Sequence, residues 1–108
     1  MTPFIQVITT TDKKETADAI ARDLVEKRLA ACVQILGPVE STYRWKGRIE
    51  TASEWLCLVK SREDCFEDIV AAIKAIHTYE TPEILTVPVL AGSDDYLEWL
   101  ELELKREA

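Results

Sequence analysis

His77 is the only imidazole in the chain, and two carboxylates, Glu80 and Glu83, follow it closely. Imidazole nitrogens and carboxylate oxygens are ligands that divalent transition metals accept, so His77 is the candidate metal ligand. One histidine excludes a multi-histidine metal site within one chain, so further ligands would have to come from another copy. The alternative is that His77 ends a helix and interacts with the negative end of its dipole.

Four other side chains could belong to a binding surface. Tyr43, Trp45 and Trp55 lie in segments with a strand-like pattern, and we interpret them as interface anchors rather than as a cofactor box. Lys60 closes an apolar strand-like segment. It either ends that strand in solvent or reaches an anionic ligand in a cleft.

The three cysteines, Cys32, Cys57 and Cys65, contain no C-x-x-C pair. An odd number without that spacing argues against a disulfide framework and against a standard structural zinc site. We therefore expect reduced thiols packed among apolar side chains.

The first elements that must position these residues are a strand and a helix. Residues 4–9 are rich in β-branched side chains, which predicts a strand. Asp12 and Glu15 have the spacing of a capping box. With an apolar stripe at helical spacing behind them, they predict a helix over residues 13–30.

A long hairpin should follow. Residues 31–45 predict a strand that Gly37 and Pro38 interrupt, because proline donates no ladder hydrogen bond and glycine favours a bulge. Residues 46–47 predict the hairpin turn, and residues 48–60 predict the return strand.

The last third predicts a helix, a strand and a terminal helix. Ser61 and Asp64 have the spacing of a second capping box, ahead of a helix that ends near His77. Residues 83–90 predict the fourth strand, and Ser93 opens the last helix.

The element order predicts an α+β, ferredoxin-like βαββαβ two-layer sandwich with an extra C-terminal helix and a long hairpin between the second and third strands. We expect residues 1–108 to form one domain. Copper chaperones, acyl-phosphate hydrolases and RNA-binding domains can use this topology, but the residues that each of these functions requires are absent from this sequence. The loop over residues 9–13 has no C-x-x-C for Cu(I) and no glycine-rich phosphate cradle, and the central strands show no exposed stacking aromatics for RNA.

The composition limits the classes of partner that the chain is expected to bind. Among 108 residues, 13 are Lys or Arg and 20 are Asp or Glu, which gives a formal net charge of −7. That charge opposes binding to nucleic acid and to anionic membranes. Apolar stretches are far shorter than the ~20 residues of a membrane span, and residues 1–4 lack the basic start of a secretory signal, so we expect a cytoplasmic protein.

The strands also predict self-association. Both faces of several strands are apolar, whereas one chain of this topology covers only one face with helices. In the third strand, for example, the residues facing one way are Trp55, Cys57 and Val59, and those facing the other are Leu56 and Leu58. The hairpin is also too long for the domain, so it must bend or overhang and expose Tyr43 and Trp45. A symmetric homo-oligomer would cover both surfaces.

Four strings in order carry a resemblance that covers essentially the whole chain: LVEKRLAACVQI at residues 24–35, STYRWKGRIE at 41–50, HTYETPEI at 77–84 and YLEWL at 96–100. The chain resembles the CutA family of divalent-cation tolerance proteins. The resemblance implies a ferredoxin-like protomer, a homotrimer formed by strand pairing at sheet edges, and a cytoplasmic role linked to copper and other divalent cations.

The resemblance also implies where a metal would lie. Metal ligation in some family members corresponds to positions Thr9, Ile76 and His77, of which only His77 carries a ligand. The Tyr-x-x-Pro-Glu segment is intact as Tyr79, Pro82 and Glu83, whereas Thr78 replaces the usual proline.

The sequence therefore predicts a non-enzymatic homotrimer in divalent-cation tolerance that binds Cu(II) or another divalent cation weakly, with no other cofactor. We expect His77 as the metal ligand and an intersubunit cleft lined by Trp45, Lys60, Tyr79 and Glu83. We also expect no nucleic-acid partner, no membrane insertion, and a downstream protein partner that the sequence does not identify. The alternative is a small-ligand sensor resembling the trimeric PII signalling proteins.

Overall fold

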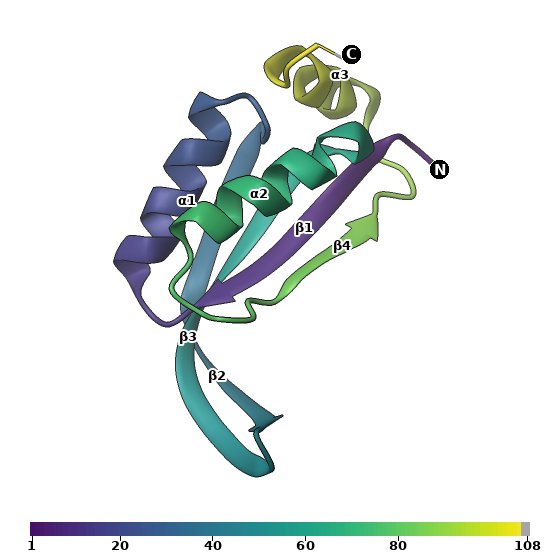
Figure 1. Cartoon of the computed structure of the whole chain (residues 1–108). Coiled ribbons are helices and arrows are strands. Elements are labelled where there is room, and N and C mark those ends of the chain that lie inside the picture. The colour runs from purple at the N-terminus through teal and green to yellow at the C-terminus, as the bar shows by residue number, and fades with distance from the viewer. Residues whose placement is uncertain (107–108) are drawn as a thin grey trace.

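The computed structural model describes residues 1–106, and in this part of the chain four strands form one antiparallel sheet with the order β2-β3-β1-β4. The elements are β1 Phe4–Thr11, α1 Lys14–Glu26, β2 Cys32–Trp45, β3 Arg48–Arg62, a 3-10 helix Glu63–Cys65, α2 Phe66–Ile76, β4 Ile84–Pro88 and α3 Asp94–Glu103. Helices α1 and α2 cover one face of the sheet, and α3 lies at one end of the molecule (Figure 1). The predicted α+β, ferredoxin-like architecture is confirmed.

The main core lies between the sheet and the helices α1 and α2. Alternate residues of the central strands point into it, so Val7 and Val59 are paired neighbours that are both fully buried. From the helices, Ile20, Leu24, Ile69 and Ile73 close the same core. We call this side of the sheet the covered face.

The other side, which we call the open face, carries the intervening residues. Helix α3 covers only one end of it, where Leu100 and Leu104 pack against Phe4. Beyond that end, Leu36, Leu85 and Val87 are 46%, 58% and 41% exposed. One chain therefore leaves much of this apolar face uncovered, as the sequence predicts.

The C-terminal end of α3 is held by arginines. Arg62 is 1% exposed, and its guanidinium donates to the Lys105 carbonyl oxygen at 2.7 Å and to Asp64 Oδ1 at 2.6 Å. Arg28 donates to the carbonyl oxygen of Glu103 at 3.2 Å. Cations at this end satisfy carbonyls that have no partner inside the helix and complement its dipole.

The hairpin of β2 and β3 extends beyond the body of the molecule (Figure 1). Strand β1 pairs with β3 only as far as Thr11 opposite Trp55, so the paired segments 39–45 and 48–54 form a two-stranded arm. The register shifts between Leu36 and Val39, at the predicted interruption. Lys46 and Gly47 turn the chain with φ angles of 49° and 80°, as in the type I′ turns that suit hairpins.

Both predicted capping boxes are wrong. Residue Lys13, rather than Asp12, precedes α1, and no side chain caps that helix. Ser61 belongs to β3, where its hydroxyl donates to the carbonyl oxygen of Leu29, and α2 begins only at Phe66. In each case the preceding strand continues past the predicted boundary, because its backbone still pairs with a neighbouring strand.

Two other boundaries differ from the prediction. Helix α1 ends at Glu26 rather than near residue 30, because Arg28 takes a left-handed φ of 57° and the amides of Leu29 and Ala30 fold back onto the carbonyl of Leu24. Strand β4 ends at Pro88 rather than at residue 90.

Candidate functional site

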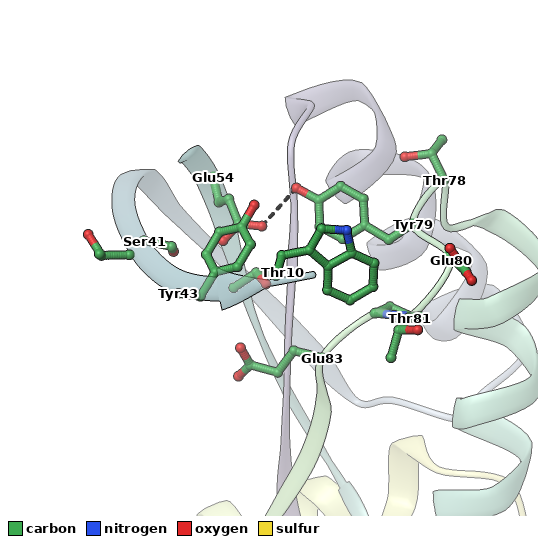
Figure 2. Close-up of a pocket in the computed structure, with 12 residues that line it drawn as sticks. Thr10, Ser41, Tyr43, Glu54, Thr78, Tyr79, Glu80, Thr81 and Glu83 are labelled. Carbon is green, nitrogen blue, oxygen red and sulfur yellow. Dashed lines mark hydrogen bonds between the residues drawn. The ribbon is translucent and has the colours of Figure 1, made fainter. Parts of the chain in front are cut away.

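A hollow of about 820 Å³ lies where the hairpin arm leaves the body. Its walls are the arm residues 41–43 with Trp45, the β3 residue Glu54, Thr10 of β1, and the loop 78–83 between α2 and β4 (Figure 2). We call it the hairpin-base hollow. A volume of this size is typical of sites for small organic molecules.

His77 fixes the loop that forms one wall. Its Nε2 lies 2.7 Å from the Thr10 carbonyl oxygen, and its Nδ1 lies 3.1 Å from the backbone nitrogen of Tyr79. A carbonyl oxygen only accepts and a backbone N–H only donates, so Nε2 carries the proton and Nδ1 accepts. His77 is thus a neutral ring that joins the loop to β1, and both of its nitrogens are already used.

Tyr79 turns from this loop toward the hairpin arm. Its hydroxyl donates to Glu54 Oε2 at 2.8 Å, and Figure 2 shows this bond across the hollow. Burial and, next, the hydrogen bond to the Glu54 carboxylate hold the pKa of Tyr79 far above its ordinary value of 10.0. Tyr79 therefore stays a protonated donor and does not become a phenolate near neutral pH.

Glu54 is the least exposed acid of the hollow. The whole residue is 5% exposed although it carries a carboxylate. Glu80 and Glu83 add two further carboxylates at exposed positions of the loop and of its end. Among the described residues that line the hollow there is no lysine, arginine, histidine or cysteine, so its electrostatics favour a positive guest.

The hollow unites three of the predicted site residues, Trp45, Tyr79 and Glu83. His77 lies behind its wall. Lys60 is not part of it: its Nζ donates to Gln34 Oε1 at 2.7 Å on the open face. Within one chain, the predicted grouping of Lys60 with the other three residues is therefore not formed.

Sequence reasoning missed Glu54 as a site residue. Its partner Tyr79 lies 25 residues away along the chain. The available signal was an acid directly before the apolar run of residues 55–59 in β3. A carboxylate at such a position needs a donor, and that requirement points to a polar neighbour from elsewhere in the fold.

The arrangement of one chain does not fit a resident metal ion. No group of three or more His, Cys, Asp or Glu side chains among residues 1–106 converges on a point that could hold one. Burial, with a further contribution from the charge of Asp18, raises the pKa of the Cys57 thiol to about 11, so Cys57 is a protonated thiol rather than a thiolate ligand. The family position Thr9 is fully buried on the covered face.

None of the helices within residues 1–106 combines the length and apolar character that crossing a membrane requires. All three cysteines are free thiols, two of them buried and Cys32 half-buried. The predicted packing of reduced thiols is thus confirmed for Cys57 and Cys65, whereas Cys32 lies on the open face opposite Lys60.

Comparison with known sequences gives a consistent family. A family model described as CutA1 divalent ion tolerance protein matches residues 5–103. The divalent-cation tolerance protein CutA of Thermus thermophilus is 43% identical over 94 residues, which is 87% of this chain and 91% of the relative. The chloroplastic protein CutA of Arabidopsis thaliana is 38% identical over 99 residues, and this chain spans only 54% of its length.

Solved structures agree. The crystal structure of CutA1 from Oryza sativa is similar with a TM-score of 0.94 and 35% identity, covering 97% of this chain and 96% of that one. The Cut A1 structure from Thermus thermophilus has a TM-score of 0.92 and 39% identity, with 94% and 99% of the two chains covered. The chain belongs to the CutA1 family of divalent ion tolerance proteins.

Proposed function

We propose that this chain acts as a non-enzymatic homotrimer in the cellular response to divalent cations, copper among them. Membership of a divalent ion tolerance family supports the cation role. The hairpin-base hollow supports the absence of catalysis, since Tyr79 is a bound, protonated donor and its partner Glu54 already holds that proton in a hydrogen bond.

The uncovered open face is the observation that carries the assembly. Leu36 on the edge strand β2 and Leu85 and Val87 on the opposite edge strand β4 are 41% to 58% exposed, and Ile49 on the arm is 69% exposed. Apolar surface of this extent costs free energy in water and is usually covered by a partner. Closed point-group symmetry lets identical chains cover such surfaces mutually, and it limits growth of the assembly.

Weak cation binding that is shared between chains is consistent with the negative net charge of the protein. Three chains would carry three times the −7 of one chain, and the resulting electrostatic field concentrates divalent cations without a preformed site.

His77 is our proposed transition-metal ligand, through Nδ1, which carries the lone pair. Because Nδ1 now accepts from the Tyr79 amide, a metal there must displace that bond, which keeps the affinity low.

Light scattering on the purified protein, combined with Cu(II) titration by calorimetry, tests the proposal. We expect a mass three times the 12.3 kDa of the chain and a Cu(II) affinity that falls in His77→Ala. A stable monomer would overturn the assembly. Equal Cu(II) binding by His77→Ala would remove His77 as the ligand and leave general attraction by the acidic surface.

A second candidate is a small-ligand sensor of the kind that PII proteins represent. The size of the hairpin-base hollow favours it. The three glutamates of the hollow oppose a nucleotide or another anion there, so this version requires a different ligand class. Calorimetry with ATP tests the anion-sensing version, and we expect the same result for wild type and for Glu54→Gln. A difference in ATP binding between the two proteins would favour an anion sensor.

We also propose that the protein acts in the cytoplasm, through a downstream protein partner. The free thiols support a reducing compartment. The names of relatives place some of them elsewhere, as in the chloroplastic protein of Arabidopsis thaliana. Cell fractionation with a tagged chain tests the compartment, and recovery in a membrane or secreted fraction would contradict it.

A further inference from the structure

The hairpin-base hollow combines aromatic walls, carboxylates and an absence of basic side chains among its described residues. We propose that it binds an organic ammonium ion, and specifically an alkyl amine with a cationic group at each end. This inference goes beyond the metal response proposed above. It needs only residues that one chain brings together.

The walls suit an ammonium ion. Tyr43, Trp45 and Tyr79 line the same hollow, and in one chain the residues Tyr43 and Trp45 are 42% and 40% exposed, which leaves surface that a ligand can share with a neighbouring subunit. Aromatic faces attract ammonium groups electrostatically and also pack against alkyl chains. The Trp45 ring already does so with a group of this type, since Lys46 Nζ lies 5.6 Å from its centroid.

Glu54 provides the deep charge. It is 5% exposed, its Oε2 accepts from Tyr79, and no described residue donates to its Oε1. A nearly buried carboxylate with one open oxygen is stabilised by a positive donor, and the lining of the hollow supplies none. Figure 2 shows Glu54 facing Tyr79, with Glu80 and Glu83 along the loop side of the hollow. One ammonium group would bind Glu54, and a second would meet the exposed carboxylates.

Size and spacing separate this guest from a metal ion. The hollow measures about 820 Å³, and its carboxylates do not converge on one point. A metal ion needs short bonds from several ligands at once, whereas a chain of a few carbon atoms can span separated carboxylates. An anion would meet three glutamates and no cation on the lining.

Calorimetry on the purified, assembled protein tests the proposal with 1,4-diaminobutane as the probe. The neutral 1,4-butanediol and MgCl₂ at matched ionic strength serve as ligand controls. We expect saturable binding of one diamine per chain, no binding of the diol, and no competition from Mg²⁺ beyond the effect of ionic strength.

Two variants with the same loss of charge sharpen the test. Glu54→Gln keeps an acceptor for the Tyr79 hydroxyl and should weaken diamine binding roughly tenfold or more, as expected for a lost charge-assisted hydrogen bond. Glu98→Gln removes one exposed carboxylate of α3 and should change the affinity by less than about twofold. Equal losses in the two variants, or equal binding of diamine and diol, would overturn the proposal.

A signal from one residue of the hollow distinguishes loss of the binding site from misfolding of a variant. The indole N–H resonance of Trp45, identified by its absence in Trp45→Phe, should shift on diamine addition to wild type and to Glu98→Gln. Its failure to move at saturating diamine would place any binding elsewhere and refute the inference. Light scattering and the Cu(II) titration report on the proposed function separately, so either proposal can fail alone.

Discussion

The two faces of the sheet are built from alternate residues of the same strands, yet only one of them is closed. On the covered face, Val7 and Val59 are fully buried under α1 and α2. On the open face, Leu85 is 58% exposed, and α3 covers only the end around Phe4. The helices of a single chain are sufficient to cover only one face of the sheet. The difference separates the core that one chain buries by itself from the apolar surface that the proposed assembly would cover.

Charge is distributed differently on the two faces as well. The open face carries Lys60 bonded to Gln34, and the buried Arg62 at the end under α3. The covered face carries apolar groups, hydroxyls and the Cys57 thiol. Changes on the covered face should therefore affect folding, and changes on the open face should affect the proposed assembly.

The largest effect is expected from a charge on the covered face. Val59→Asp would place a carboxylate in a fully buried apolar position without a donor, at a cost of about 5 kcal/mol or more. That cost is comparable to the whole stability of a small domain. Far-UV circular dichroism should show loss of the native signal. A variant with wild-type unfolding behaviour would mean that this face is not the core.

Arg62 tests the end of the open face that α3 covers. Arg62→Met removes the donor of the Lys105 carbonyl and leaves Asp64 and Glu101 without their shared partner. We expect a loss of about 2–4 kcal/mol in urea unfolding and faster hydrogen exchange in α3. The control is Arg22→Met, whose ion pair with Glu26 is largely exposed and should cost less than about 0.5 kcal/mol. Equal losses in both variants would contradict the role of Arg62.

Alkaline pH should weaken the covered face. Burial raises the pKa of Cys57 from 9.0 to about 11 in the folded chain. Between these values the unfolded chain loses a proton that the folded chain keeps, so this stabilisation is complete below about pH 9 and declines as the pH rises toward about 11. The full difference corresponds to roughly 2–3 kcal/mol.

Urea unfolding of wild type and Cys57→Ala between about pH 8 and about pH 11 measures this contribution. The variant should lose less stability with pH than wild type. Some dependence should remain, because the pKa values of Cys65 and Tyr79 are raised as well, in both cases chiefly by burial. Identical pH slopes in the two proteins would exclude Cys57 as the cause.

The smallest effect on the fold is expected on the open face. Leu85→Asp places its charge at a position that is already 58% exposed, so the chain itself should lose less than about 1 kcal/mol. The assembly should suffer instead, because a carboxylate would have to be buried in the proposed interface. Light scattering should give a lower mass with native circular dichroism retained. An unchanged mass would remove Leu85 from that interface.

The fold was predictable because its signals are local or periodic. Alternation places Leu58 and Val59 on opposite faces, and the Lys46-Gly47 turn needs only positive φ angles at two adjacent residues. The capping boxes at Asp12 and Ser61 were wrong because strand pairing with distant segments extended both strands. Local hydrogen-bonding patterns do not contain that competition.

The site was predictable only in part. Tyr79 and Glu83 lie in one loop, and Trp45 ends β2, so sequence motifs could identify them. Lys60 pairs with Gln6, while Glu54 lies beyond the end of β1, about 20 Å further along an extended strand. That separation keeps Lys60 out of the hollow. Glu54 joins it only through a tyrosine that the tertiary fold brings close.

The position of β1 in the sheet has a consequence for synthesis of the chain. This strand leaves the ribosome before the other strands of the sheet, whereas both of its neighbours, β3 and β4, come later, and β4 does not end until Pro88. The β2–β3 hairpin closes over a two-residue turn and can form early, whereas β1 must wait for β3 and β4. Until then Ile5, Val7 and Ile8 of this strand have no neighbouring strand. The nascent protein therefore completes its sheet only after Pro88 has left the ribosome.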